Sequence, residues 1–221
     1  MYTNRKKTIL MLKQNTSVFS SNNLKNIETK LWDYFQQGVK NKKSSFHYPT
    51  IASLNKSSLS LRTVILRKVI RDERSIFFYT DYRSKKIKEL KVNNNIFMHI
   101  YDSKNKIQLQ VEGKSKIFNK TNSNKEVWKE LSSFARTAYL YKKPPGAIIL
   151  GENDLKLDKE ERGYKNFTIV KFEVNKIFWL FLDYNQNKKA VFLYKNKSFI
   201  SNWLVPELCI SINLIYVINN L

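Results

Sequence analysis

Apolar residues recur at every third or fourth position near the start of the chain, which is the spacing of one helix face. The series consists of Leu24, Ile27, Leu31, Phe35 and Val39. This period predicts an amphipathic helix. Ser21 or Asn22 precedes it and offers a side-chain oxygen that can cap the first turn. Residues 1–22 are mostly polar, and we expect them to form a loosely held arm.

From Tyr48 onward the pattern changes to short runs rich in β-branched and aromatic residues, separated by polar turns. Such runs are typical of strands, and their spacing predicts an antiparallel sheet or barrel. Ile107, Leu109 and Val111 alternate with polar residues, so this strand has one apolar face and one polar face. The expected strands are Thr50–Leu54, Leu61–Ile70, Ser75–Thr80, Asn95–Tyr101, Ile107–Phe118, Phe167–Val174, Ile177–Asp183, Ala190–Tyr194 and Phe199–Leu204.

Two further helices are expected between the strands. Ser84–Val92 is short and basic, and Asn124–Leu140 carries apolar residues at helical spacing. Prolines in the loop Lys142–Gly146 end the second helix because proline cannot continue it. The pattern of strands and helices therefore predicts a mainly β (α+β) fold in one domain, residues 23–206. Residues 207–221 form a C-terminal extension whose role the sequence leaves open.

Composition adds a strong positive charge to this picture. Lysine and arginine number 40 against 18 acidic residues, a net charge of +22 over 221 residues. Such a balance is found in proteins that bind nucleic acids or acidic membranes. The lysines are, however, spread along an asparagine-rich chain without a long basic block, which favours a general compositional bias. Apolar residues at 42% are enough for a core and exclude an intrinsically disordered chain.

Targeting and metal signals are weak. The apolar run after the basic N-terminus is too short for a signal peptide, and the C-terminal apolar stretch is shorter than the ~20 residues that span a bilayer. Cys209 is the single cysteine, which excludes an internal disulfide and fits a reducing compartment. Two histidines are too few for a histidine-rich metal site. We expect a cytoplasmic protein without a membrane segment.

Basic and hydroxyl side chains gather where an expected strand passes into a helix. Thr80 ends the strand, and Ser84, Lys85 and Lys86 open the helix. Free backbone N–H groups and the helix dipole favour an anion at such a point, and a phosphate is the natural occupant. A solvated basic turn explains the same residues equally well on physical grounds alone.

The same residues carry a family resemblance. RTVILR at residues 62–67, FFYTDYRSKKIKEL and IQLQVEGKSKIF, in this order, resemble the pyridoxamine 5′-phosphate oxidase-like flavoproteins. That family folds as an FMN-binding split β-barrel and usually forms a homodimer with FMN at the interface. The PPG loop and the late segment FTIVKFEVNKIFWLFL look most similar to a subgroup typified by cyanobacterial and plant members of uncertain substrate.

The resemblance implies a set of cofactor contacts. The strand from Arg62 to Arg67 would lie along FMN, with its backbone at the flavin ring and its arginine toward the phosphate. Tyr79 and Thr80 match a pair that contacts FMN, Lys85 and Lys86 match the phosphate-binding pair, and Gln108 matches a flavin-binding glutamine. The implied cofactor residues are Arg62, Thr63, Val64, Ile65, Arg67, Tyr79, Thr80, Ser84, Lys85, Lys86, Gln108 and Trp179.

The substrate positions depart from the family pattern. Arg67 stands where the true oxidases carry a lysine that touches substrate, and their tyrosine, arginine and serine set is not preserved near Trp128, Ser132 and Arg136. The resemblance therefore implies that FMN binding is retained and the vitamin B6 site is not. Arg67 and Arg136 are the candidates for holding a small anionic substrate. No catalytic side chain is assigned.

Three functions remain open at this stage. The first is an FMN-dependent oxidoreductase that transfers a hydride from a small substrate to the flavin. The second is a non-catalytic FMN- or tetrapyrrole-binding protein, which the altered substrate positions would allow. The third and least favoured is a basic β-barrel that binds nucleic acid, suggested by the charge and by 14% aromatic residues.

Overall fold

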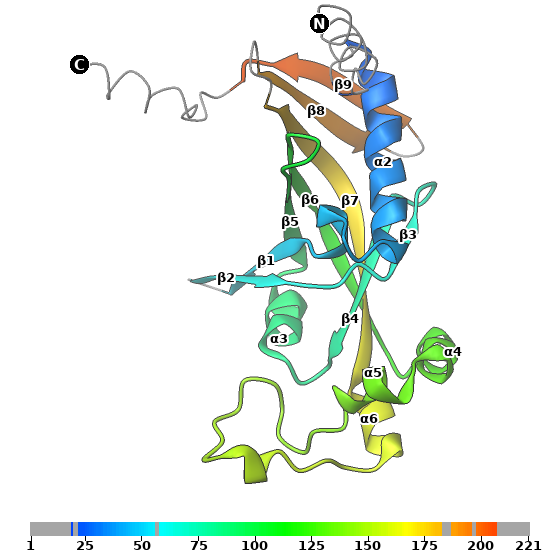
Figure 1. Ribbon diagram of the computed structural model, residues 1–221, viewed down its shortest axis with the longest axis vertical. Helices are drawn as coiled ribbons and strands as arrows, with labels where there is room; N and C mark the ends of the chain where they lie inside the picture. Colours follow the sequence, from blue (N-terminus) through cyan, green and yellow to red (C-terminus); the bar gives the residue numbers. More distant parts are fainter. Residues whose placement is uncertain (1–18, 20–21, 56–57, 183–186, 196–197, 207–221) are drawn as a thin grey trace, which may run out of the picture.

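The computed structural model describes residues 19, 22–55, 58–182, 187–195 and 198–206. These residues form one antiparallel sheet in the order β2-β1-β5-β6-β7-β4-β3, with β8 added to β7 and β9 to β8 (Figure 1). The strands are β1 (Thr50–Asn55), β2 (Ser58–Thr63), β3 (Lys68–Ile70), β4 (Ser75–Asp81), β5 (Asn95–Asp102), β6 (Ile107–Asn119), β7 (Phe167–Phe181), β8 (Lys188–Lys195) and β9 (Ser198–Leu204).

The helices lie at the sides and at one end of this sheet. α2 (Leu24–Lys40) runs beside β8 and β9, and α3 (Lys85–Val92) lies beneath β1 and β2 (Figure 1). Three short helices gather at the end of the molecule opposite β9 (Figure 1). They are α4 (Asn122–Glu130), α5 (Ser133–Thr137) and α6 (Glu160–Asn166). A long loop, residues 138–159, connects α5 to α6 and contains the short 3-10 helix Glu152–Asp154. This loop is called the excursion below.

The central strand β7 explains the curvature of the sheet. It pairs with β6 along its length, while its other edge pairs with β4 over residues 167–173 and with β8 over residues 176–181. The register with β6 shifts between Glu112 and Gly113, where this change of partner occurs. The prediction of separate strands at 167–174 and 177–183 is therefore corrected to one strand with an irregularity, because extended pairing with β6 continues through it.

The apolar face of the sheet packs on α2. Buried residues of β5, β6 and β7 such as Met98, Leu109 and Trp179 join Leu31 and Phe35 of the helix in the main core. The alternation predicted for residues 107–111 is confirmed by the burial of Ile107, Leu109 and Val111. Phe19 is buried as well and stacks on Tyr34 with ring centroids 5.5 Å apart, so at least this residue of the predicted arm is held by the core.

The cap of the first helix lies one residue after the predicted Asn22. Asn23 caps α2 in place of Asn22, because its side chain accepts a hydrogen bond from the backbone N–H of Asn26 at 3.1 Å. Ser21, the other predicted cap, lies outside the described residues. The predicted helix over Asn124–Leu140 is also wrong in its continuity. Leu131 has an extended backbone, and Ser132 caps the separate helix α5 through the N–H of Ala135.

The predicted strand Leu61–Ile70 is two strands. β2 ends at Thr63 and β3 begins at Lys68, and residues 64–67 cross from one to the other. Val64 and Leu66 donate backbone N–H bonds to the carbonyl oxygens of Pro49 and His47, and Arg67 donates to that of Phe77.

No helix among the described residues is long and apolar enough to cross a membrane. The predicted C-terminal extension, residues 207–221, lies outside the described residues.

Candidate functional site

A buried carboxylate ties α3 to the first two strands. Glu89 of α3 is 2% exposed. It accepts hydrogen bonds from Ser53 of β1 at 2.6 Å and Ser60 of β2 at 2.8 Å, and it forms an ion pair with Arg62 at 2.8 Å. Burial alone would raise the pKa of Glu89, but the hydrogen bonds from Ser53, Ser60 and Arg62 hold it below its usual value. Glu89 is therefore a carboxylate, and Arg62 has a fixed position.

Hydroxyl and ammonium groups lie at the start of the same helix. Lys86 donates a hydrogen bond to the hydroxyl of Thr80 at 2.9 Å, and that hydroxyl is 3.5 Å from the hydroxyl of Ser84. Ser84 stands at the N-cap position of α3 and is buried, yet it makes no side-chain cap bond. Ile87 donates its backbone N–H to the carbonyl of Ser84, and the N–H groups of Lys85 and Lys86 lack the usual side-chain cap and remain available to an anion. Lys85 is largely exposed and lies 3.8 Å from Glu89.

Lys86 is a partly buried cation in this group. Burial lowers its pKa, and the neighbouring charge of Arg62 lowers it further, while Asp81 and Glu89 act in the opposite direction. Two cations held close together and partly removed from water repel each other, and Glu89 pairs directly with Arg62 alone of these two cations. Arg62, Thr80, Ser84 and Lys86 are called the basic cluster below.

A second group includes Arg67, the last residue of the segment 64–67 that crosses from β2 to β3 and is called the crossing segment below. The guanidinium of Arg67 lies over the ring of Tyr79 at 5.7 Å, and Tyr79 and Tyr139 both pack edge-on against Phe167 at 5.2 Å. Burial raises the pKa of Tyr139 to about 12, and the nearby charge of Arg67 opposes this rise. Tyr139 therefore keeps its proton and can donate a hydrogen bond. Arg67, Tyr79 and Tyr139 are called the aromatic–arginine group below.

The predicted cofactor residues at the end of β2 and in the crossing segment differ in how far they are buried. Thr63 is exposed, Val64 is buried and Ile65 is half-buried. The segment from Val64 to Arg67 is irregular, so the prediction of a continuous strand along a flavin is replaced by β2 followed by a crossing. Its side chains still alternate, with Val64 and Leu66 inward and Arg67 outward.

Three predicted residues lie away from the basic cluster. Gln108 is half-buried on the outer face of the sheet, paired with Tyr101 and Leu180. Trp179 is fully buried in the core on the opposite face, with its indole N–H unpaired among the described residues. Arg136 donates to the backbone oxygens of Trp128 and Lys129 at 3.0 Å each and pairs with Glu160 at 3.0 Å. These contacts with α4 and α6 already engage its guanidinium.

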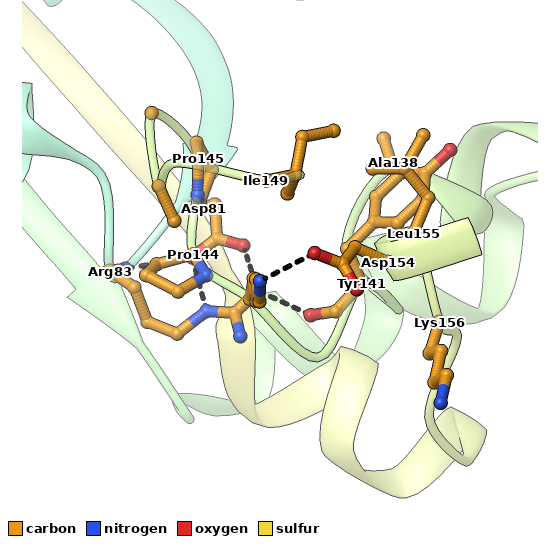
Figure 2. A pocket seen from close by; sticks show the side chains of 13 residues that line it. Asp81, Arg83, Ala138, Tyr141, Pro144, Pro145, Ile149, Asp154, Leu155 and Lys156 are labelled. Atoms are coloured by element: carbon orange, nitrogen blue, oxygen red, sulfur yellow. Dashed lines mark hydrogen bonds and ion pairs between the residues drawn. The ribbon is translucent and has the colours of Figure 1, made fainter. Parts of the chain in front are cut away.

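A pocket of about 300 Å³ opens between Asp81 and the proline loop, and none of the four residues of the basic cluster lines it. Figure 2 shows Arg83 between the carboxylate of Asp81 and the carbonyl of Tyr141. Arg83 binds Asp81 at 2.7 Å, Tyr141 O at 2.9 Å and Lys142 O at 3.0 Å. This arginine fastens the excursion to the end of β4, directly after Thr80.

The donor chemistry of the basic cluster fits a phosphate monoester. It combines a guanidinium, an ammonium, two hydroxyls and the start of a helix, which are the groups that bind phosphate oxygens in proteins. Residues 29–119, which contain the whole cluster, match the family described as pyridoxamine 5′-phosphate oxidase, FMN-binding domain. These residues form a pyridoxamine 5′-phosphate oxidase-like FMN-binding domain. FMN, a phosphate monoester, is the cofactor of this domain.

Solved structures agree with this domain in fold. A pyridoxamine 5′-phosphate oxidase-related, FMN-binding protein from Nostoc punctiforme is 16% identical, with a TM-score of 0.66, covering 80% of this chain and 96% of that chain. PhzG from Burkholderia lata, solved with tetrahydrophenazine-1-carboxylic acid, is 12% identical, with a TM-score of 0.64, covering 81% of this chain and 91% of that chain. At these identities the likeness establishes the fold. No curated protein matches the chain.

The match to the family and the similar solved structures confirm three expectations: the family, the split-barrel fold and the cofactor. The narrower cyanobacterial and plant subgroup and the individual cofactor contacts stay predictions. Sequence reasoning missed Glu89 and its serine partners. A Glu four residues after Lys85 is a common helix pairing, and nothing local indicates that its main partner is an arginine 27 residues earlier.

Proposed function

We propose that this protein binds FMN through the basic cluster and takes a hydride from a small anionic substrate. The observation that carries this proposal is the basic cluster itself: Arg62 fixed by Glu89, and Lys86 fixed by Thr80, beside the uncapped start of α3. Burial and the charge of Arg62 disfavour the charged form of Lys86, and only part of this is offset by Asp81 and Glu89, since the pKa of Lys86 stays below its usual value. A bound phosphate would stabilise both cations.

The residues of the chain would divide the work between phosphate and substrate. Arg62 and Lys86 would neutralise the phosphate, and Thr80 and Ser84 would bind its oxygens. Bound FMN supplies a hydride acceptor in its flavin ring, and the protein supplies orientation and charge. No side chain needs to act as a base for this transfer, and we assign none.

Arg67 is the better candidate for the substrate anion. Among the described residues it forms no ion pair, and its guanidinium is exposed above Tyr79. Arg136, the other candidate, is held by Glu160 and two backbone oxygens. The ligand named in the PhzG structure is a carboxylic acid, which is the kind of anion that a free guanidinium binds in a bidentate manner.

We also propose that a second copy of the chain completes the site. Gln108 and the basic cluster lie on different faces of the sheet, since Gln108 pairs with Tyr101 on the outer face while Arg62 pairs with the buried Ile51. The outer face also exposes Leu61, Phe97 and Tyr101. A homodimer would cover these apolar groups and bring Gln108 of one copy toward the cofactor of the other.

The substrate role of Arg67 predicts a selective loss in Arg67→Gln. The test monitors anaerobic bleaching of bound flavin by small amines, alcohols and reduced nicotinamides, with each anionic compound paired with its neutral analogue. We expect one anionic compound to reduce the flavin. Arg67→Gln should raise the concentration of that compound needed for half-maximal reduction rate about tenfold, while the neutral analogue is unaffected, because one charge-assisted contact is lost. Arg136→Gln is the matched control, with little change expected.

Two results would contradict this proposal. Flavin that stays oxidised with every compound would favour the non-catalytic flavoprotein. An equal loss for the anionic compound and its neutral analogue in Arg67→Gln would remove Arg67 from the substrate site.

The depressed pKa of Lys86 predicts that FMN binding weakens at alkaline pH. A phosphate stabilises the charged ammonium, so the complex holds the Lys86 proton more tightly than the free protein does. FMN binding is then coupled to proton uptake, and affinity falls as pH rises through the pKa of the free protein, by at most about tenfold per pH unit. Lys86→Arg should abolish this fall because arginine keeps its charge. Fluorescence titration from about pH 7 to 10, with riboflavin as the phosphate-free control, measures it; an unchanged pH profile in Lys86→Arg would contradict the assignment.

A further inference from the structure

Glu89 is the one carboxylate that contacts the basic cluster directly within the described part of the chain. It faces Arg62 at 2.8 Å and Lys85 at 3.8 Å, and it receives the hydroxyls of Ser53 and Ser60. A buried carboxylate is stable only when its oxygens are paired in this way. All of its partners come from β1, β2 and the first turn of α3, so Glu89 joins the elements that carry Arg62 and Lys86.

The guanidinium of Arg62 is held from one side. One terminal nitrogen donates to Ser53, the other donates to Glu89, and Ser53 itself donates to Glu89. Arginine has five N–H donors in a rigid plane, so the groups pointing away from Glu89 remain available for a second anion. The Arg62 side chain is 20% exposed while Glu89 is 2% exposed, which places the carboxylate behind the arginine as seen from solvent.

We propose that Glu89 is a positioning residue that gives the cofactor site its preference for a phosphorylated flavin, by presenting the guanidinium of Arg62 to the phosphate. This inference rests on the proposed FMN site. Glu89 touches neither phosphate nor flavin in this arrangement, and it acts through Arg62. The site therefore discriminates FMN from riboflavin through a network of residues rather than through separate cations.

Two other roles for Glu89 make different predictions. If Glu89 competed with phosphate for Arg62, its neutralisation would strengthen FMN binding. If it served only to attach α3 to the sheet, its neutralisation would displace Lys86 and the start of α3, and FMN binding would weaken by the same factor with or without Arg62. Positioning predicts a loss that is confined to the phosphate and that requires Arg62, because only the phosphate contacts the group that Glu89 orients.

The ratio of riboflavin to FMN dissociation constants separates these roles. We expect Glu89→Gln to weaken FMN binding about tenfold, the loss of one charge-assisted hydrogen bond, and riboflavin binding less than about twofold. Titrations monitored by flavin fluorescence, below the unfolding temperature of each variant, give both constants. Ser60→Ala is the milder variant if Glu89→Gln folds poorly, since Ser60 contacts Glu89 and not Arg62; it should lower the ratio in the same direction by a smaller factor.

Two controls complete the design. Glu28→Gln removes another buried carboxylate, which lies on α2 and contacts Tyr194 at 3.1 Å and Arg71 at 3.5 Å. It should lower the melting temperature without changing the ratio. In an Arg62→Ala background, Glu89→Gln should have no further effect on the ratio, because the group that it orients is gone.

The outcomes are distinct. A lower ratio in Glu89→Gln that disappears in the Arg62→Ala background supports positioning. A raised ratio, an unchanged ratio, or an equal effect in the Arg62→Ala background would overturn it. Failure of the proposed function would be seen separately, as an unmodified protein that binds neither flavin or binds both equally.

Discussion

Replacing Arg62 with alanine is expected to weaken FMN binding by about ten- to a hundredfold, which corresponds to about 1.5–3 kcal/mol for a hydrogen-bonded charge lost at the phosphate. The same change removes the closest cationic partner of the buried Glu89, Arg62 at 2.8 Å, and leaves it only the exposed ammonium of Lys85 at 3.8 Å. Breaking a buried pair in this way costs about 3 kcal/mol of stability. Arg62→Ala should therefore lower both the FMN affinity and the melting temperature.

The double variant Arg62→Ala/Glu89→Gln separates the two effects. Removing both charges eliminates the buried carboxylate that has lost Arg62, so the melting temperature should recover most of its loss. FMN affinity should stay low because the phosphate still lacks its guanidinium. Isothermal titration with FMN and thermal denaturation without ligand measure the two quantities. Wild-type FMN affinity in Arg62→Ala would remove Arg62 from the phosphate site.

The second large effect is expected at Gly113, where β6 faces the irregular point of β7. A Cβ placed there would lie 2.0 Å from the carbonyl oxygen of Glu173 and 2.5 Å from the ring of Phe172. The neighbouring strand cannot move aside, because β7 changes partners from β4 to β8 at this point. Gly113→Ala should thus cost about 3 kcal/mol or more, and lower the melting temperature by about 6–12 °C.

Gly151→Ala is the matched control for this prediction. Gly151 lies in the excursion, its φ of 178° is ordinary extended backbone, and a Cβ there meets nothing within 4 Å. Thermal denaturation should show a change of less than about 0.5 kcal/mol. Equal melting temperatures for Gly113→Ala and Gly151→Ala would mean that the close approach of β6 and β7 is wrong.

Local pattern predicted most of the elements, and it failed where tertiary contacts override local preference. The three- and four-residue spacing of Leu24 to Val39 gave the long helix, which buries the same face. The run from Leu61 to Ile70 is uniformly rich in strand-forming residues, yet backbone bonds to His47 and Pro49 pull its middle out of the sheet. Likewise, Ser132 begins a new helix within a periodic segment because its hydroxyl caps Ala135.

The site was predictable to the extent that its residues are close in sequence. Thr80, Ser84 and Lys86 meet around one strand-to-helix junction, so their grouping follows from local geometry. Glu89 and Tyr139 could not be predicted in the same way. Glu89 joins Arg62 across β1 and β2, and Tyr139 reaches Phe167 of β7 through packing alone, so both depend on the assembled sheet.

We propose that this chain binds FMN in a site shared by two copies. Sedimentation velocity of the purified protein with added FMN, followed at the visible absorbance of flavin, tests binding and assembly together. We expect flavin to sediment with the protein at twice the 26.3 kDa mass of the chain, with one FMN per chain. Flavin that stays at the meniscus, or that sediments with a single chain, would contradict it.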